Sequence, residues 1–112
     1  MPCEVWLSEE AVEDRNRLTR EQEKKVIWWR DRLAQDVTVG DPIRKSLIPV
    51  VLKRNYEIDN LWRVELPGGW RALYTIASRP PGRPEVLILR ILCHKDYDRG
   101  LGMRSVWGSF LF

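Results

Sequence analysis

The sequence predicts a single-domain α+β protein: an N-terminal strand, a two-helix hairpin and then an antiparallel strand meander. In the first third of the chain, apolar residues recur every three or four positions, as on one face of a helix. Between residues 61 and 93, three apolar runs are separated by Gly and Pro clusters, as in strands joined by turns. With 112 residues, 44% of them hydrophobic, the chain is long enough to bury one core.

The strand and the start of each helix are predicted by local signals. Residues 3–7 alternate like a strand, and Ser8 precedes Glu9 and Glu10, an acidic first turn that suits the positive end of a helix. We expect this first helix to run to about Leu18. Thr19 with Gln22 three residues later has the form of a capping box, so a second helix begins at once.

The second helix carries one apolar face and one tryptophan outside it. The apolar positions that fall on one face are Val26, Trp29, Leu33 and Val37. Trp28 points nearly the opposite way. It either contacts a partner or lies under the irregular segment that follows.

The connector and the meander follow. Gly40-Asp41-Pro42 ends the helical region, and residues 43–60 predict a packed connector with a short helix after Pro49. The predicted strands are 61–66, 70–77 and 85–93, and the predicted turns are 67–69 and 80–84.

The middle strand of the meander sorts its side chains onto two faces. One face carries Trp70, Ala72, Tyr74 and Ile76. Arg71 lies on the other face with Leu73 and Thr75, and so projects from a rigid element. The last strand is apolar almost throughout, as expected for a strand covered on both faces.

Charge is distributed unevenly along the chain, whose net charge is +3. Residues 1–36 carry seven Lys/Arg against nine Asp/Glu, and residues 37–112 carry twelve against seven. The positive charges of the second part are mostly arginines, including Arg44, Arg54, Arg63, Arg71, Arg90, Arg99 and Arg104. Guanidinium groups bind phosphate well, so these arginines either bind a nucleic acid or form a solvated basic surface.

Several protein classes are not expected. Cys3 and Cys93 match no metal-ligand spacing, so we expect neither a metal nor a cofactor. The longest apolar run, residues 86–93, is too short to cross a bilayer. Glu4, Glu9 and Glu10 come too early for a signal peptide, so we expect a cytoplasmic protein without membrane contact.

The order of elements and two motifs resemble the RelE/ParE superfamily of toxins from type II toxin–antitoxin pairs. The motifs are Arg71-Ala-Leu-Tyr74 after the glycine turn and His94-Lys95-Asp96-Tyr97-Asp98-Arg99 after the last strand. The ending with histidine resembles the HigB and YoeB branches. The resemblance covers residues 1–103 and implies the microbial-RNase-like fold of RelE and ParE. It also implies an mRNA interferase, an endoribonuclease that cuts mRNA, usually at the ribosome, and is silenced by an antitoxin protein.

Metal-free RNA cleavage needs a base, an acid and cations that stabilise the phosphorane-like transition state. By the resemblance, Arg71 binds and stabilises the phosphate. His94 and Tyr97 are the proton-transfer candidates, and an unperturbed histidine pKa near ~6.5 suits either role. Lys95 is a second phosphate ligand or a proton donor. Asp96 orients His94, accepts a proton or balances surface charge.

Further basic residues are candidates for RNA contact. Lys53 and Arg54 correspond to connector positions where relatives carry basic residues, and Arg99 lies in the closing motif. Arg63 either reaches phosphate or pairs with Glu65.

The alternative function is non-catalytic: a ParE-like toxin that inhibits gyrase, or a degenerate binding protein of the same fold. The expected partners are a cognate antitoxin, mRNA and the ribosome, in a homodimer or a toxin–antitoxin hetero-oligomer. Residues 104–112 form an apolar tail outside the family pattern. The tail mediates self-association, occupies a groove intended for the antitoxin or is an extension without function.

Overall fold

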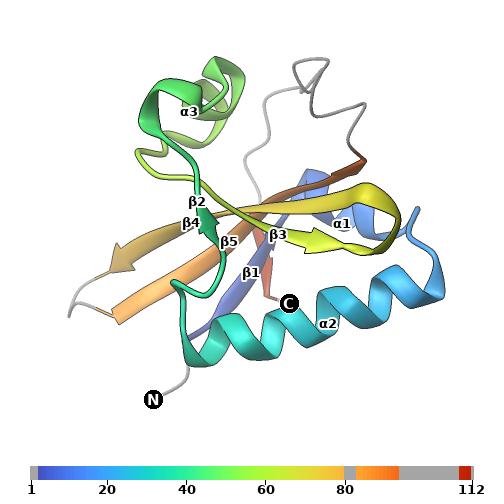
Figure 1. Cartoon of the computed structure of the whole chain (residues 1–112). Helices are drawn as coiled ribbons and strands as arrows, with labels where there is room; N and C mark the ends of the chain where they lie inside the picture. Colours follow the sequence, from blue (N-terminus) through green and yellow to red (C-terminus); the bar gives the residue numbers. More distant parts are fainter. Residues whose placement is uncertain (1–2, 80–82, 94–108, 112) are drawn as a thin grey trace.

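The structure is a computed structural model that describes residues 3–79, 83–93 and 109–111 (Figure 1). Its strands are β1 (Val5–Ser8), β2 (Asp41–Pro42), β3 (Trp62–Leu66), β4 (Trp70–Arg79), β5 (Arg83–Cys93) and β6 (Ser109–Leu111). Its helices are α1 (Glu9–Arg15), α2 (Arg20–Gln35) and α3 (Val50–Tyr56), with 3-10 turns at Lys45–Leu47 and Pro67–Gly69.

One mixed sheet organises the described part of the chain, with the strand order β2-β3-β4-β5-β1-β6. β1 runs parallel to β5, and the other neighbouring strands are antiparallel. Figure 1 shows α2 on one side of this sheet and α3 on the other. The predicted α+β class is therefore confirmed.

The local signals at the helix starts act as predicted. Ser8 Oγ accepts a hydrogen bond from the Ala11 N–H at 3.0 Å and caps α1. Thr19 and Gln22 form both hydrogen bonds of the capping box, at 3.2 and 3.0 Å. α1 ends at Arg15, earlier than expected, because the N–H groups of residues 16–18 bond to carbonyls three residues back rather than four.

Two hydrophobic clusters fill the two sides of the sheet. The first lies under α1 and α2 and includes Ala11, Val26, Leu33, Val64, Tyr74 and Ile88. The second lies under α3 and consists of Ile48, Leu52, Leu61, Leu73, Leu89 and Leu92. The predicted alternation of the middle strand is confirmed, since Tyr74 belongs to the first cluster and Leu73 to the second.

The meander is longer than the sequence predicts. The β4–β5 ladder extends to pairs of Ser78 with Pro84 and Arg79 with Arg83. As expected, β5 is covered on both faces: Ile88 and Ile91 belong to the first cluster, and Leu89 and Leu92 to the second.

The last strand comes from the apolar tail. In β6, Leu111, Phe110 and Ser109 pair antiparallel with Trp6, Leu7 and Ser8 of β1. This part of the tail therefore completes the sheet of its own chain. None of the helices that the structure describes has the length and apolar content needed to cross a membrane.

Candidate functional site

Arg71 lies on β4 and shares a sheet face with Leu73, as the alternation predicts, and α3 covers this face. Its neighbours in the ladders are Glu65 on β3 and Leu92 on β5. The Arg71 Nε atom is 3.4 Å from Glu65 Oε1, and 21% of the Arg71 side chain is exposed. A guanidinium group is thus held on a central strand and reaches the surface.

Arg63 reaches the same carboxylate. Its Nε atom is 4.0 Å from Glu65 Oε1, so Glu65 stands between two arginines. The three side chains carry a net positive charge. Glu65 is 54% exposed, and ion pairs of exposed groups are weak, so little free energy is needed to displace its carboxylate.

Lys53 and Arg54 are exposed in the last turn of α3. They are on the same side of the sheet as Arg71, because α3 covers the second cluster through Leu52. They belong to a different element from the Arg63–Glu65–Arg71 group.

The other predicted site residues lie outside the described part of the chain: His94, Lys95, Asp96, Tyr97 and Arg99. The last described residue before them is Cys93, which pairs with Trp70 at the start of β4. The described part of β5 therefore ends one ladder position from Arg71.

Sequence reasoning missed a buried charged network between α1, α3 and β5. Arg90 donates from Nε to Asp14 Oδ2 at 2.7 Å and from Nη2 to Oδ1 at 3.1 Å. It also donates from Nη1 to Glu10 Oε2 at 3.3 Å, and the Tyr56 hydroxyl donates to Glu10 Oε1 at 3.3 Å. The one available signal was Arg90 itself, a charge within the longest apolar run.

This network corrects the interpretation of Arg90 as one of the arginines suited to phosphate. Arg90 is only 9% exposed, and two carboxylates occupy its guanidinium. Burial alone lowers the pKa of Arg90, but hydrogen bonds and charge from Asp14 outweigh this effect and raise the pKa above its ordinary value. Burial also raises the pKa of Tyr56 to about 12. Both groups therefore keep their ordinary protonation at neutral pH.

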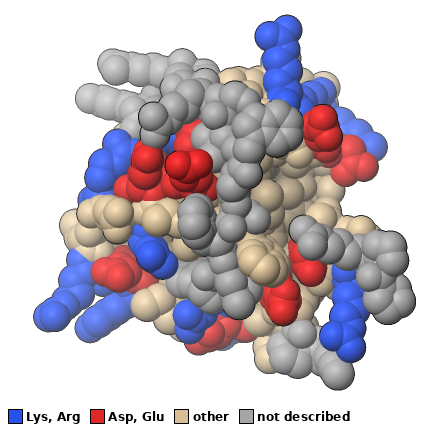
Figure 2. All heavy atoms as spheres, turned by 180° about the vertical axis from the view of Figure 1, so that it is seen from behind, with Lys and Arg blue, Asp and Glu red and all other residues tan. Residues whose placement is uncertain are grey.

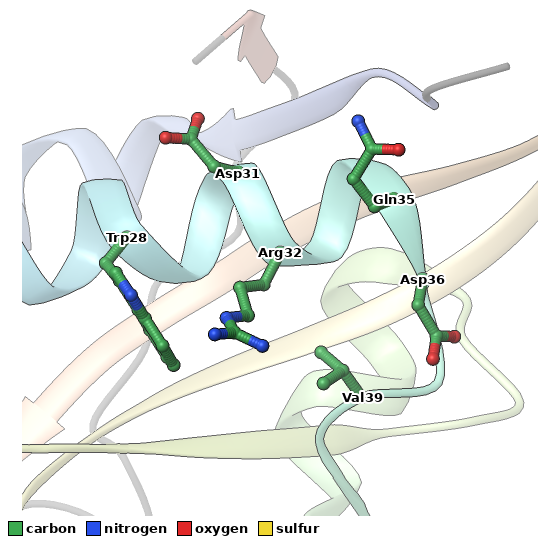
Figure 3. A pocket seen from close by; sticks show the side chains of 6 residues that line it. All are labelled: Trp28, Asp31, Arg32, Gln35, Asp36 and Val39. Carbon is green, nitrogen blue, oxygen red and sulfur yellow. The ribbon is translucent and has the colours of Figure 1, made fainter.

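A second surface feature lies on α2. Trp28 is 40% exposed, so the segment after the helix does not cover it. Lys25 Nζ lies 3.7 Å and Arg32 Cζ 4.3 Å from the ring centroid, distances typical of cation–π contacts. Trp28 lines a shallow pocket together with Asp31, Arg32, Gln35, Asp36 and Val39. Figure 3 shows that Trp28 and Arg32 project from one side of α2, where Val39 also lies, whereas Asp31 and Gln35 project from the opposite side of the helix.

The charge asymmetry of the sequence does not make the side drawn in Figure 2 uniformly basic. On the side drawn in Figure 2, the described Lys/Arg and Asp/Glu side chains are interspersed. Within the described residues, no group of three or more His, Cys, Asp and Glu side chains is placed to hold a metal ion. A scan of the chain against models of known protein families gives no match, and no curated protein is significantly similar to it.

Proposed function

We propose that this chain is the toxin of a toxin–antitoxin pair and a metal-independent endoribonuclease that cleaves mRNA at the ribosome. The observation that carries the proposal is Arg71, a partly exposed guanidinium on a central strand, one ladder position from the point where β5 leads into the His-Lys-Asp-Tyr segment. The order of strand, helical hairpin, connector and meander supports a RelE/ParE-like arrangement.

In the proposed reaction, a base removes the proton of a ribose 2′-hydroxyl, and the resulting oxygen attacks the adjacent phosphorus. The bond to the 5′-oxygen breaks, and an acid protonates this leaving group. The products are a 2′,3′-cyclic phosphate and a 5′-hydroxyl. Charge develops on the phosphoryl oxygens, where a preorganised guanidinium such as that of Arg71 is most effective.

His94 and Tyr97 are the proposed proton-transfer residues, and Lys95 is a second phosphate ligand or a proton donor. Asp96 orients His94 or accepts a proton.

Flanking phosphates are the proposed ligands of the remaining cations. Arg63 is close enough to Arg71 to share the same Glu65 carboxylate. Lys53, Arg54 and Arg99 extend the contact along the RNA.

Glu65 has a defined place in this proposal. In the free protein its carboxylate neighbours the Arg71 guanidinium, and an RNA phosphate replaces it there. A bidentate arginine–phosphate pair is stronger than the partly exposed ion pair at 3.4 Å that it displaces.

The test compares Arg71→Ala with Arg83→Ala, which removes an exposed arginine from the opposite end of the β4–β5 hairpin. New RNA ends are mapped after induced expression and in a purified translation mixture. Loss of one preorganised donor typically costs about 100- to 1,000-fold in rate, so we expect Arg71→Ala to abolish cleavage. Arg83→Ala should cleave like the parent, and Glu65→Gln should bind RNA more tightly.

Two results would contradict the proposal. Folded Arg71→Ala that arrests growth and cuts RNA as strongly as the parent would remove Arg71 from the reaction. Growth arrest by the parent without new RNA ends would instead favour the gyrase-directed class.

The proposed partner is an antitoxin that covers the α2 surface around Trp28. An amphipathic helix with acidic residues suits this surface, because it matches an exposed indole and the Lys25 and Arg32 cations beside it. The test co-expresses the chain with the small reading frame adjacent to its gene and titrates salt on the purified pair. We expect binding that weakens with salt but keeps an apolar contribution. No association, together with normal host growth when the chain is expressed alone, would leave a degenerate binding protein as the better reading.

A further inference from the structure

β5 extends beyond the strand that pairs with it on one side. β1 pairs with β5 only from Val86 to Ile88, and β1 ends at Ser8. Beyond Ile88, side chains instead of the β1 backbone form the hydrogen bonds to this edge of β5. Ser8 Oγ donates to the Leu89 carbonyl at 2.7 Å, and the Ile91 N–H donates to Asp14 Oδ2 at 2.9 Å. The Asp14 carboxylate therefore stands where a further residue of β1 would supply a carbonyl.

The same stretch of β5 contains a bulge. Tyr74 pairs with Ile88 and Leu73 pairs with Arg90, so Leu89 is an extra residue on β5. After the bulge the ladder continues with Leu92 opposite Arg71 and Cys93 opposite Trp70. Because side chains alternate along a strand, a slip of one residue would change both the partner of Arg71 and the faces of the last residues of β5.

Arg90 belongs to this bulge, and Asp14 binds both its side chain and the backbone just after it. The Asp14 side chain is 2% exposed, and its two oxygens bind the Arg90 Nε and Nη2 atoms while Oδ2 also accepts the Ile91 N–H. Charged, bidentate hydrogen bonds of this kind are both stronger and more directional than neutral ones. The pair is thus suited to select one register among those that the apolar residues of β5 allow.

We propose that Asp14 and Arg90 are positioning residues that fix the β5 bulge and, with it, the register of Leu92 and Cys93 beside Arg71 and Trp70. The effect of this positioning on catalysis rests on the proposed function, because the proposed catalytic residues follow Cys93 directly in the sequence, beginning at His94. Glu10 and Tyr56 support the pair from α1 and α3 through the remaining Arg90 nitrogen.

The first experiment measures thiol labelling of Cys93 by a disulfide reagent in a Cys3→Ser background, which leaves one cysteine in the chain. We expect Asp14→Asn to accelerate labelling roughly 10- to 100-fold, since a hydrogen bond between charged groups at this site resists local opening of the strand end. Arg17→Ala removes the exposed arginine that binds Asp14 at 2.6 Å but leaves the Asp14 carboxylate in place for Arg90 and the Ile91 N–H, and should label like the parent.

A second control separates local opening from general destabilisation. Leu33 is a fully buried residue of α2 in the first cluster and makes none of the hydrogen bonds described for the Asp14–Arg90 pair, so Leu33→Ala should lower the melting temperature without removing that pair. If Cys93 labels no faster in Asp14→Asn than in Leu33→Ala, after urea is used to match the stability of the two, the proposal is overturned.

The second experiment measures RNA cleavage by the same variants. We expect Asp14→Asn to lower kcat with little change in KM, and Arg17→Ala to leave both unchanged. If Asp14→Asn speeds Cys93 labelling but the parent itself cuts no RNA, the labelling result supports the positioning role. The missing cleavage then counts only against the proposed nuclease. Unchanged labelling and unchanged kcat in Asp14→Asn, with an active parent, would overturn the positioning role and leave the nuclease intact.

Discussion

Tyr74→Phe tests how β4 is tied to the turn that follows α2. The Tyr74 side chain is completely buried, and its ring stacks on Trp62 at a centroid distance of 6.1 Å. Its hydroxyl donates to the Val37 carbonyl at 3.0 Å and accepts from the Gly40 N–H at 3.1 Å. Phenylalanine keeps the ring and removes both hydrogen bonds, so the substitution isolates the contribution of the hydroxyl.

The expected loss follows from those two bonds. A hydrogen bond contributes about 0.5–1.5 kcal/mol net, so removal of both should lower the free energy of unfolding by about 1–3 kcal/mol. For a domain near this size, such a loss lowers the melting temperature by about 4–12 °C. Near-UV circular dichroism should change little, because the stacked ring remains.

The pH dependence gives a second signature. Burial raises the pKa of Tyr74 to about 12, whereas an unfolded tyrosine titrates near ~10. The neutral hydroxyl is therefore favoured in the native state, and its stabilisation is complete below pH ~10 and lost as the pH rises toward 12. Urea unfolding of parent and Tyr74→Phe should give a difference that is constant from pH 7 to 9 and shrinks above pH 10. Equal stabilities at pH 7, or a difference that grows in alkali, would refute the reasoning.

Two further substitutions probe the same turn and the α2 surface. Gly40→Ala should lower the free energy of unfolding by about 1–3 kcal/mol in urea titrations. The new Cβ would lie 2.5 Å from the Tyr74 hydroxyl oxygen and 2.7 Å from the Arg63 carbonyl oxygen, which is too close for either contact. An unchanged urea midpoint would contradict this expectation. Trp28→Ala should change stability by less than about 0.5 kcal/mol but weaken antitoxin binding by about 2 kcal/mol or more, measured by calorimetry. Leu47→Ala, which truncates a more exposed apolar residue on the other side of the sheet, is the matched control and should leave binding unchanged.

Local sequence signals determined much of the secondary structure. The Ser8 and Thr19 caps, the apolar face of α2, the short α3 after Pro49 and the two faces of β4 all depend on residues within about one helical turn or two strand positions of each other. Interactions of this range can be read from spacing alone. The same spacing placed Arg71 on the sheet face of Leu73, and the structure shows that α3 covers this face.

Only the tertiary structure decided which charges are available. Arg90 and Asp14 are 76 residues apart in the chain, and the packing of α1 against β5 brings their side chains together. Glu65 meets Arg71 through strand pairing, which links residues by register and not by sequence distance. The sequence could identify its arginines as cations, but burial and pairing depend on the packed arrangement, which separates the buried Arg90 from the partly exposed Arg71.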